Sequence, residues 1–190
     1  MSSQLQTAKE IISRGIFDDV RSFSQLEKRI SALGKDNTKI LGDAFEIFIE
    51  AYLATQNKFL LEQHWVVGNV PQNVRKEANL PNHSTLGIDG VFRDRNGLVV
   101  PYQVKFRTFR PKLAYREVAE FLGCTERAKD RVIFTNCNDI ALTVKNRDGV
   151  RTVRGFNFDE LTSQDFRAIE GWLKGKSAPL KKWNPLPHQA

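Results

Sequence analysis

Residues 88–106 hold the pattern that most limits how this chain can fold. Two runs rich in β-branched and aromatic residues, Ile88 to Arg93 and Leu98 to Phe106, flank the turn Asp94-Arg95-Asn96-Gly97. An Asn-Gly pair between two such runs is a strong signal for a β-hairpin. Pro101 interrupts the second run and predicts an edge position or a bulge, because proline cannot donate to a strand ladder. We therefore expect two antiparallel strands here.

The first third of the chain has helical patterns. Ser24 with Glu27 matches a capping box, which predicts the start of a helix that ends before Gly34. Asp36-Asn37 can cap a longer helix that runs to about Asn57. Apolar residues occur on nearly every side of this second helix, so we expect it to be largely buried.

The rest of the chain alternates between strand and helix signals. The predicted elements are a strand at His64–Val67, a loop at 71–86, a helix at Leu113–Leu122, a central strand at Arg131–Thr135 and a strand at Val150–Phe158. Thr162 with Asp165 matches a second capping box, which opens a helix that ends before Gly175. This order predicts an α/β fold, a mixed β-sheet flanked by helices.

The length of 190 residues suits one domain, or one domain with an appendage. We expect an N-terminal helical extension at 1–35, a core domain at 36–175 and a linker rich in proline and lysine at 176–190. No apolar run approaches the roughly 20 residues of a membrane span. The polar N-terminus lacks a signal core, and Cys124 and Cys137 have no metal or disulfide spacing, so we expect a cytoplasmic protein with reduced thiols.

The charge favours a polyanionic partner. The formal net charge is +7 and the isoelectric point is about 9.5. Arg107, Arg110, Lys112 and Arg116 alternate with aromatic residues directly after the hairpin. This basic-aromatic run fits contacts to the phosphates of DNA, and it equally fits a solvated rim whose aromatic residues pack inward.

Three polar residues of the hairpin suggest chemistry. Asp89 lies at the start of the first strand, and Gln103 and Lys105 lie on one face near the end of the second. A carboxylate, an amide oxygen and an ammonium group at one point can hold Mg²⁺ beside a phosphate, with Mn²⁺ as an alternative cation. The backbone carbonyl of Val104 can also reach such a cation. Asp89 before a glycine also suits a plain turn, and Lys105 also suits an exposed edge strand.

These residues resemble the PD-(D/E)xK nuclease superfamily and, within it, the Mrr-like restriction endonuclease branch, where Gln often replaces the acidic residue before x-Lys. The segment Gly42-Asp43-Ala44-Phe45-Glu46 looks like the first core helix of the family. The resemblance covers roughly residues 40 to 140. It implicates Glu46, Asp89, Gln103 and Lys105 as the catalytic residues: the first three gather the metal, and Lys105 helps to activate the attacking water. Ile88 stands where the family often has proline.

The resemblance implies a restriction-endonuclease-like fold and a Mg²⁺-dependent DNA endonuclease, whose products carry 5′-phosphate and 3′-hydroxyl ends. A transient dimer would serve double-strand cleavage. The segment 185–189, Pro-Leu-Pro-His-Gln, is similar to the stretch before the ATP-binding loop of superfamily 2 helicases, which suggests a helicase domain in cis; a plain proline-rich tail is the alternative. A catalytically inactive DNA-binding module and an RNA-directed nuclease remain as other interpretations. His83 is a weak candidate for a substrate contact.

Overall fold

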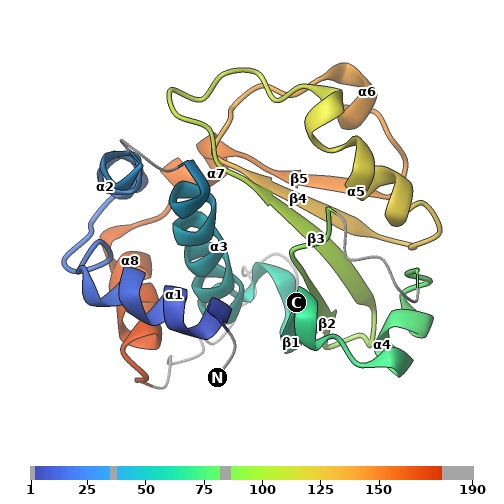
Figure 1. Ribbon diagram of the computed structural model, residues 1–190, viewed down its shortest axis with the longest axis horizontal. Helices are drawn as coiled ribbons and strands as arrows, with labels where there is room; N and C mark the ends of the chain where they lie inside the picture. Colours follow the sequence, from blue (N-terminus) through green and yellow to red (C-terminus); the bar gives the residue numbers. More distant parts are fainter. Residues whose placement is uncertain (1–2, 35–37, 82–86, 177–190) are drawn as a thin grey trace, which may run out of the picture.

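A five-stranded mixed sheet separates two groups of helices (Figure 1). The structure, a computed structural model, describes residues 3–34, 38–81 and 87–176. The strands lie side by side in chain order: β1 (Leu61–Val66), β2 (Gly90–Asp94), β3 (Val99–Lys105), β4 (Arg131–Thr135) and β5 (Val150–Val153). The first three are antiparallel, whereas β4 and β5 continue the sheet in parallel. This architecture confirms the predicted mixed sheet flanked by helices.

The predicted hairpin forms between β2 and β3, where Phe92 pairs with Val100. The prediction for Pro101 is wrong, because β3 is the middle strand of the sheet and its pairing with β2 has no bulge. Pairing of β3 with β4 begins only at Tyr102. The proline therefore sits just outside the parallel ladder, where its missing N–H interrupts no pairing with β4.

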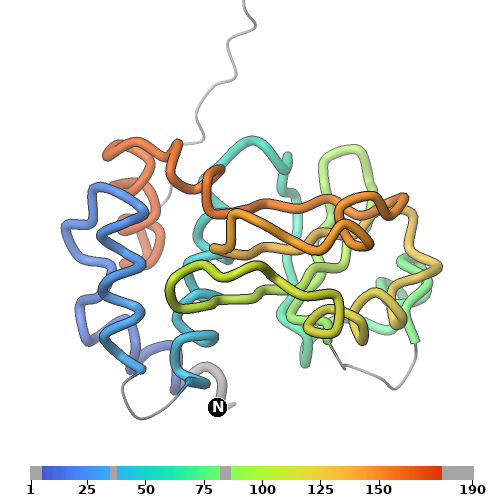
Figure 2. Tube along the Cα trace, turned by 90° about the horizontal axis from the view of Figure 1, so that it is seen from above, coloured from blue at the N-terminus to red at the C-terminus, as the bar shows by residue number. Residues whose placement is uncertain are grey.

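One face of the sheet carries the larger helical layer. It consists of α1 (Ser3–Ser13), α2 (Phe23–Leu33), α3 (Thr38–Thr55), α7 (Gly155–Asp159) and α8 (Ser163–Leu173). The buried helix α3 packs against β3, and α1, α2 and α8 lie against its far side (Figures 1 and 2). Phe45 and Phe48 of α3 and Phe158 of α7 join one aromatic core with Tyr102 and Phe134 of the sheet. The N-terminal helices therefore extend the core of the sheet.

The opposite face carries shorter helices: α4 (Gln72–Glu77), α5 (Ala119–Cys124) and α6 (Leu142–Lys145). Phe121 and Leu122 of α5 pack with Val91, Val99 and Ile133 of the sheet in a second core. Three 3-10 turns complete the fold, at Asn57–Phe59, Val67–Asn69 and Tyr115–Glu117. Among the described residues, no helix combines the length and the apolar character that crossing a membrane requires.

Helix starts show which capping signals hold. The Thr162–Asp165 box is confirmed, with the Thr162 hydroxyl accepting from the Asp165 N–H. The first predicted box is wrong, because Ser22 caps α2 by accepting from the Gln25 N–H at 3.3 Å. The Glu27 carboxylate does not take part in a cap and instead accepts hydrogen bonds from Arg110 and Asn136. The Asp36-Asn37 cap, His83, and the linker beyond residue 176 with its segment 185–189 lie outside the described residues.

Four other predicted elements change their bounds. The first strand spans β1 rather than His64–Val67, and the predicted loop at 71–86 contains α4, where Val74 is buried. The predicted helix at 113–122 starts later, because Leu113 pairs with the backbone of Asp139 and Ala141 instead. The last strand ends before residue 158, because the Asn157 side chain accepts from the N–H of residue 154 and starts α7.

Candidate active site

Asp89 lies where β2 and β3 part. Its N–H donates to the Tyr102 carbonyl at 3.0 Å, and its Oδ2 accepts from the Val104 N–H at 2.6 Å. The carboxylate thus accepts a hydrogen bond from β3 that a backbone carbonyl would accept in a regular sheet. This contact holds Asp89 beside the end of β3, just before β2 begins. Burial raises the pKa of Asp89 to about 6, although the Val104 hydrogen bond and the charge of Lys105 act in the opposite direction.

Glu46 reaches the same region from α3. It is partly buried, and burial raises the pKa of its carboxyl to about 8, with further increases from the charges of Asp89, Asp43 and Glu50. The charge of Lys105 lowers it. Charges act strongly only at short range in a protein. Asp89 and Lys105 therefore lie within the range over which their charges act on Glu46.

Gln103 lies on β3, the strand that carries Lys105, beneath α5. Its side chain is buried, at only 2% exposure. Gly87 packs against it: a Cβ there would come within 2.7 Å of the Phe121 backbone nitrogen and 3.3 Å of Gln103 Nε2. The side-chain oxygen of Gln103 is buried and has no hydrogen-bond partner within the described part of the chain. Buried amide oxygens normally have one, so this oxygen can still accept a donor or a cation.

Val104 contributes its N–H to the site, and its side chain faces the α3 core at 6% exposure. The use of its carbonyl as a metal ligand stays a prediction. In the described ranges, no three His, Cys, Asp or Glu side chains are grouped so that they could hold a metal ion by themselves. A metal site here would therefore need oxygens of another kind, such as the amide of Gln103.

Two further groups belong to this region, and the sequence interpretation did not assign them to the site. Glu50 lies one helical turn after Glu46, and burial raises its pKa to about 7. The Tyr102 hydroxyl lies 2.7 Å from His64 Nε2, and burial lowers the pKa of His64 to about 4, which keeps the imidazole neutral. Gly90 makes room for this phenol, since a Cβ there would lie 2.3 Å from its oxygen. Helical spacing from Glu46 could have indicated Glu50.

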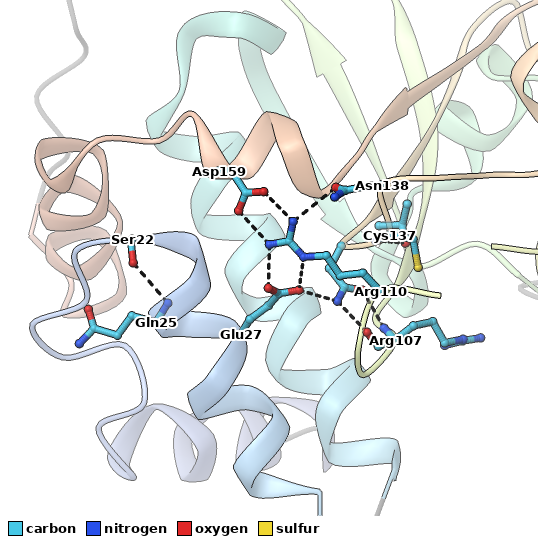
Figure 3. Close-up of polar contacts among 10 residues, drawn as sticks. Ser22, Gln25, Glu27, Arg107, Arg110, Cys137, Asn138 and Asp159 are labelled. Atoms are coloured by element: carbon cyan, nitrogen blue, oxygen red, sulfur yellow. Dashed lines mark hydrogen bonds and ion pairs between the residues drawn. The ribbon is translucent and has the colours of Figure 1, made fainter. Parts of the chain in front are cut away.

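Arg110 of the basic-aromatic run points into the protein (Figure 3). Its Nε and Nη2 donate to the two oxygens of Glu27 at 2.8 and 2.7 Å, and its Nη1 and Nη2 donate to Asp159 at 2.6 and 2.8 Å. The side chain is 18% exposed. The hydrogen bonds that Arg110 donates to Asp159 and then to Glu27 raise the pKa of Arg110 above its usual range. Its guanidinium is thus engaged by two carboxylates instead of facing a DNA phosphate.

The other cations of the run remain at the surface. Arg107 pairs with Glu117 at 2.6 Å and keeps 38% of its side chain exposed. Lys112 lies 3.5 Å from Asp139 with 57% exposed, and Arg116 is exposed. Exposed ion pairs of this kind are weak and exchange readily. Contact of these three residues with DNA stays a prediction.

No family model and no curated protein matches the chain. The solved structures that are similar to this chain include two restriction enzymes. One is the ATP-dependent Type ISP restriction-modification enzyme LlaBIII bound to DNA, at 19% identity and a TM-score of 0.50, covering 70% of this chain and 8% of that one. The chain has a restriction-endonuclease-like fold. The other is the MspJI restriction endonuclease in complex with a 27-mer oligonucleotide, at 14% identity and a TM-score of 0.40, covering 90% of this chain and 40% of that one. The chain therefore spans less than half the length of either protein.

Proposed function

We propose that this chain is a Mg²⁺-dependent DNA endonuclease domain, the nuclease part of a restriction or phage-defence helicase–nuclease. The observation that carries the proposal is the convergence of Glu46 and Asp89 beside Lys105 at the end of the β2–β3 hairpin. The restriction-endonuclease-like fold supports a nuclease. The description of LlaBIII as ATP-dependent and bound to DNA supports DNA as the substrate and an ATP-driven partner domain.

The residues fit a hard divalent cation. Mg²⁺ takes oxygen ligands and is held in proteins by one or two carboxylates together with water and substrate phosphate. Glu46 and Asp89 would supply the carboxylates, and the unpartnered oxygen of Gln103 would supply a neutral ligand. The Val104 carbonyl is the remaining proposed ligand. Burial, and then repulsion from Asp89, Asp43 and Glu50, raise the pKa of Glu46, and a bound cation would relieve the repulsive part of this shift.

Each residue has a distinct role in hydrolysis of the phosphodiester. A bound divalent cation supplies charge neutralisation on the phosphate and lowers the pKa of water. Lys105 orients the attacking water and offsets charge that develops on the phosphate. The Val104 N–H fixes the Asp89 carboxylate so that it needs no reorientation. The water oxygen gives up a proton to solvent as it attaches to phosphorus, the P–O bond to the 3′-oxygen breaks, and that oxygen takes up a proton from solvent, which yields 5′-phosphate and 3′-hydroxyl ends.

Plasmid cleavage tests this proposal. Wild-type protein should cut supercoiled plasmid with Mg²⁺ or Mn²⁺ and should leave it intact with EDTA. We expect Lys105→Ala and Asp89→Ala to lower the rate by a factor of at least about 100, with unchanged circular dichroism, because each removes a group from the chemical step. The control Lys129→Ala removes an exposed lysine just before β4, at the opposite end of the sheet, and should cut normally.

Four outcomes would contradict the proposal. Normal cutting by both site variants would refute the site, and cutting in EDTA would refute the metal. Salt-dependent, metal-independent binding of DNA without any nicking would favour the inactive DNA-binding module. Preferential cleavage of a matched RNA would favour the RNA-directed nuclease.

A further inference from the structure

The turn that follows β3 displays an aromatic side chain in an unusual backbone conformation. Phe109 is 98% exposed. Its φ is +65° and that of Arg110 is +48°, in the left-handed region that favours glycine. A bulky residue there is a genuine outlier, and such strain persists only where the surrounding structure imposes it.

The base of this turn is fixed on both sides. The Arg107 N–H donates to Asn136 Oδ1, and the Asn136 amide donates back to the Arg107 carbonyl, both at 2.7 Å. Arg110 is held by its two carboxylates, and the same Glu27 accepts from the Asn136 amide at 2.8 Å. Phe106, just before the turn, is buried against Phe45 with ring centroids 5.3 Å apart. The ring of the exposed phenylalanine therefore projects from a rigid base.

The position of the turn relates it to the candidate active site. Phe109 follows Lys105 by four residues, and four residues of chain span at most about 14 Å. That reach corresponds to about four base steps of B-DNA. Arg107 and Lys112, with 38% and 57% of their side chains exposed, flank the ring and suit phosphate contacts. An exposed ring between cations matches the pattern of a base-stacking platform.

We propose that Phe109 stacks on an unpaired nucleobase of the DNA close to the cleaved phosphodiester. This inference rests on the proposed function and adds a contact that selects DNA in which a base is unpaired. The ring needs a free base face, so DNA with an unpaired or unstacked base should bind more tightly than a continuous duplex. The rigid, strained turn places the ring before binding, which avoids the cost of ordering it on contact.

The test measures DNA binding by the full chain in EDTA, so that no cleavage occurs. Fluorescence polarisation compares a duplex carrying one unpaired 2-aminopurine with the same duplex fully paired. Phe109→Ala should weaken binding to the unpaired site by about five- to a hundredfold, whereas Phe109→Trp should retain it. Leu142→Ala, which truncates a 64% exposed side chain on α6, is the matched control and should bind as wild type does. Wild type should also quench the 2-aminopurine fluorescence, and Phe109→Ala should not.

A glycine variant separates function from strain. Phe109→Gly should raise the melting temperature, because glycine adopts a positive φ without strain, and should lose affinity like the alanine variant. An unchanged melting temperature would overturn the strained, preset turn. Equal affinity of Phe109→Ala and wild type, or an equal loss in Leu142→Ala, would overturn the stacking role and leave the proposed nuclease intact. A wild-type protein that neither binds nor cleaves DNA would overturn both.

Discussion

Removal of the Arg110 guanidinium should destabilise the whole fold. The side chain joins Glu27 of α2 to Asp159 of α7, and it lies over the Phe23 ring at 5.2 Å from the centroid. Glu27 is 17% exposed, so Arg110→Ala leaves a carboxylate in a largely dry position without its main partner. The variant also removes the anchor that holds the positive φ at residues 109 and 110.

The expected magnitude follows from the burial of each partner. Breaking a buried ion pair by removing one member costs about 3–5 kcal/mol, because the remaining charge stays desolvated. Asn136 still donates to Glu27, and Asp159 is 42% exposed, so we expect the lower end, about 3 kcal/mol. At about 2–4 °C for each kcal/mol in a domain of this size, the melting temperature should fall by about 6–12 °C. Such a loss is a large fraction of the stability of about 5–15 kcal/mol that is typical of folded domains.

Urea denaturation measures this effect through the midpoint at constant slope. The matched control is Lys112→Ala, whose exposed pair with Asp139 should contribute less than about 1 kcal/mol. Adding Glu27→Gln to Arg110→Ala should recover part of the loss, because the buried unpaired charge is then gone. The buried-charge reasoning is refuted if Arg110→Ala lowers the free energy of unfolding no more than Lys112→Ala does. It is also refuted if adding Glu27→Gln to Arg110→Ala lowers the free energy of unfolding further.

Two further predictions address a helix start and the acidic cluster. Ser22→Ala should lower the free energy of unfolding by about 1 kcal/mol through loss of the cap, whereas Ser24→Ala, at an exposed position, should change it by less than about 0.5 kcal/mol; equal effects in urea denaturation would contradict this assignment. Because the pKa of Glu46 rises from 4.5 to about 8 on folding, the folded state binds its proton more tightly. The metal-free free energy of unfolding should therefore fall as pH rises between these values, and Mg²⁺ should reverse the fall. Melting curves at pH 5, 7 and 9 check this, and a Glu46→Gln variant with the same pH profile as wild type would refute it.

Local signals predicted the parts of the fold that local chemistry controls. The Asn-Gly turn sets the hairpin, where the Asp94 side chain accepts from the N–H groups of Asn96 and Leu98 at 2.9 Å. The same is true of the cap at Thr162. The hairpin register places Asp89 and Lys105 toward the same end of the sheet, and this shared placement follows from the turn and the two strand patterns in the sequence.

Contacts between distant segments were not predictable. Glu27 and Arg110 are separated by 83 residues, and nothing near either one indicates the other. Sequence signals for the cap of α2 were ambiguous, since Ser22 with Gln25 fits the capping box as well as Ser24 with Glu27 does. Which serine caps α2 depends on tertiary structure. Glu27 binds Arg110 in the loop after β3 and is not used in a capping box, and Ser22 caps the helix.

The neutral side chain at residue 103 suits the position that it occupies. A carboxylate at this position would be buried beneath α5, since Gln103 is 2% exposed. It would add a further negative charge to a region where burial already raises the pKa values of both Glu46 and Asp89. In the proposed metal site, the Gln103 amide would supply an oxygen ligand without this cost. At the proposed metal site, a bound divalent cation and Lys105 would together outweigh the Glu46 and Asp89 carboxylates by one positive charge. An acidic residue at position 103 would cancel that excess, whereas the amide would leave the proposed site attractive to a phosphodiester anion.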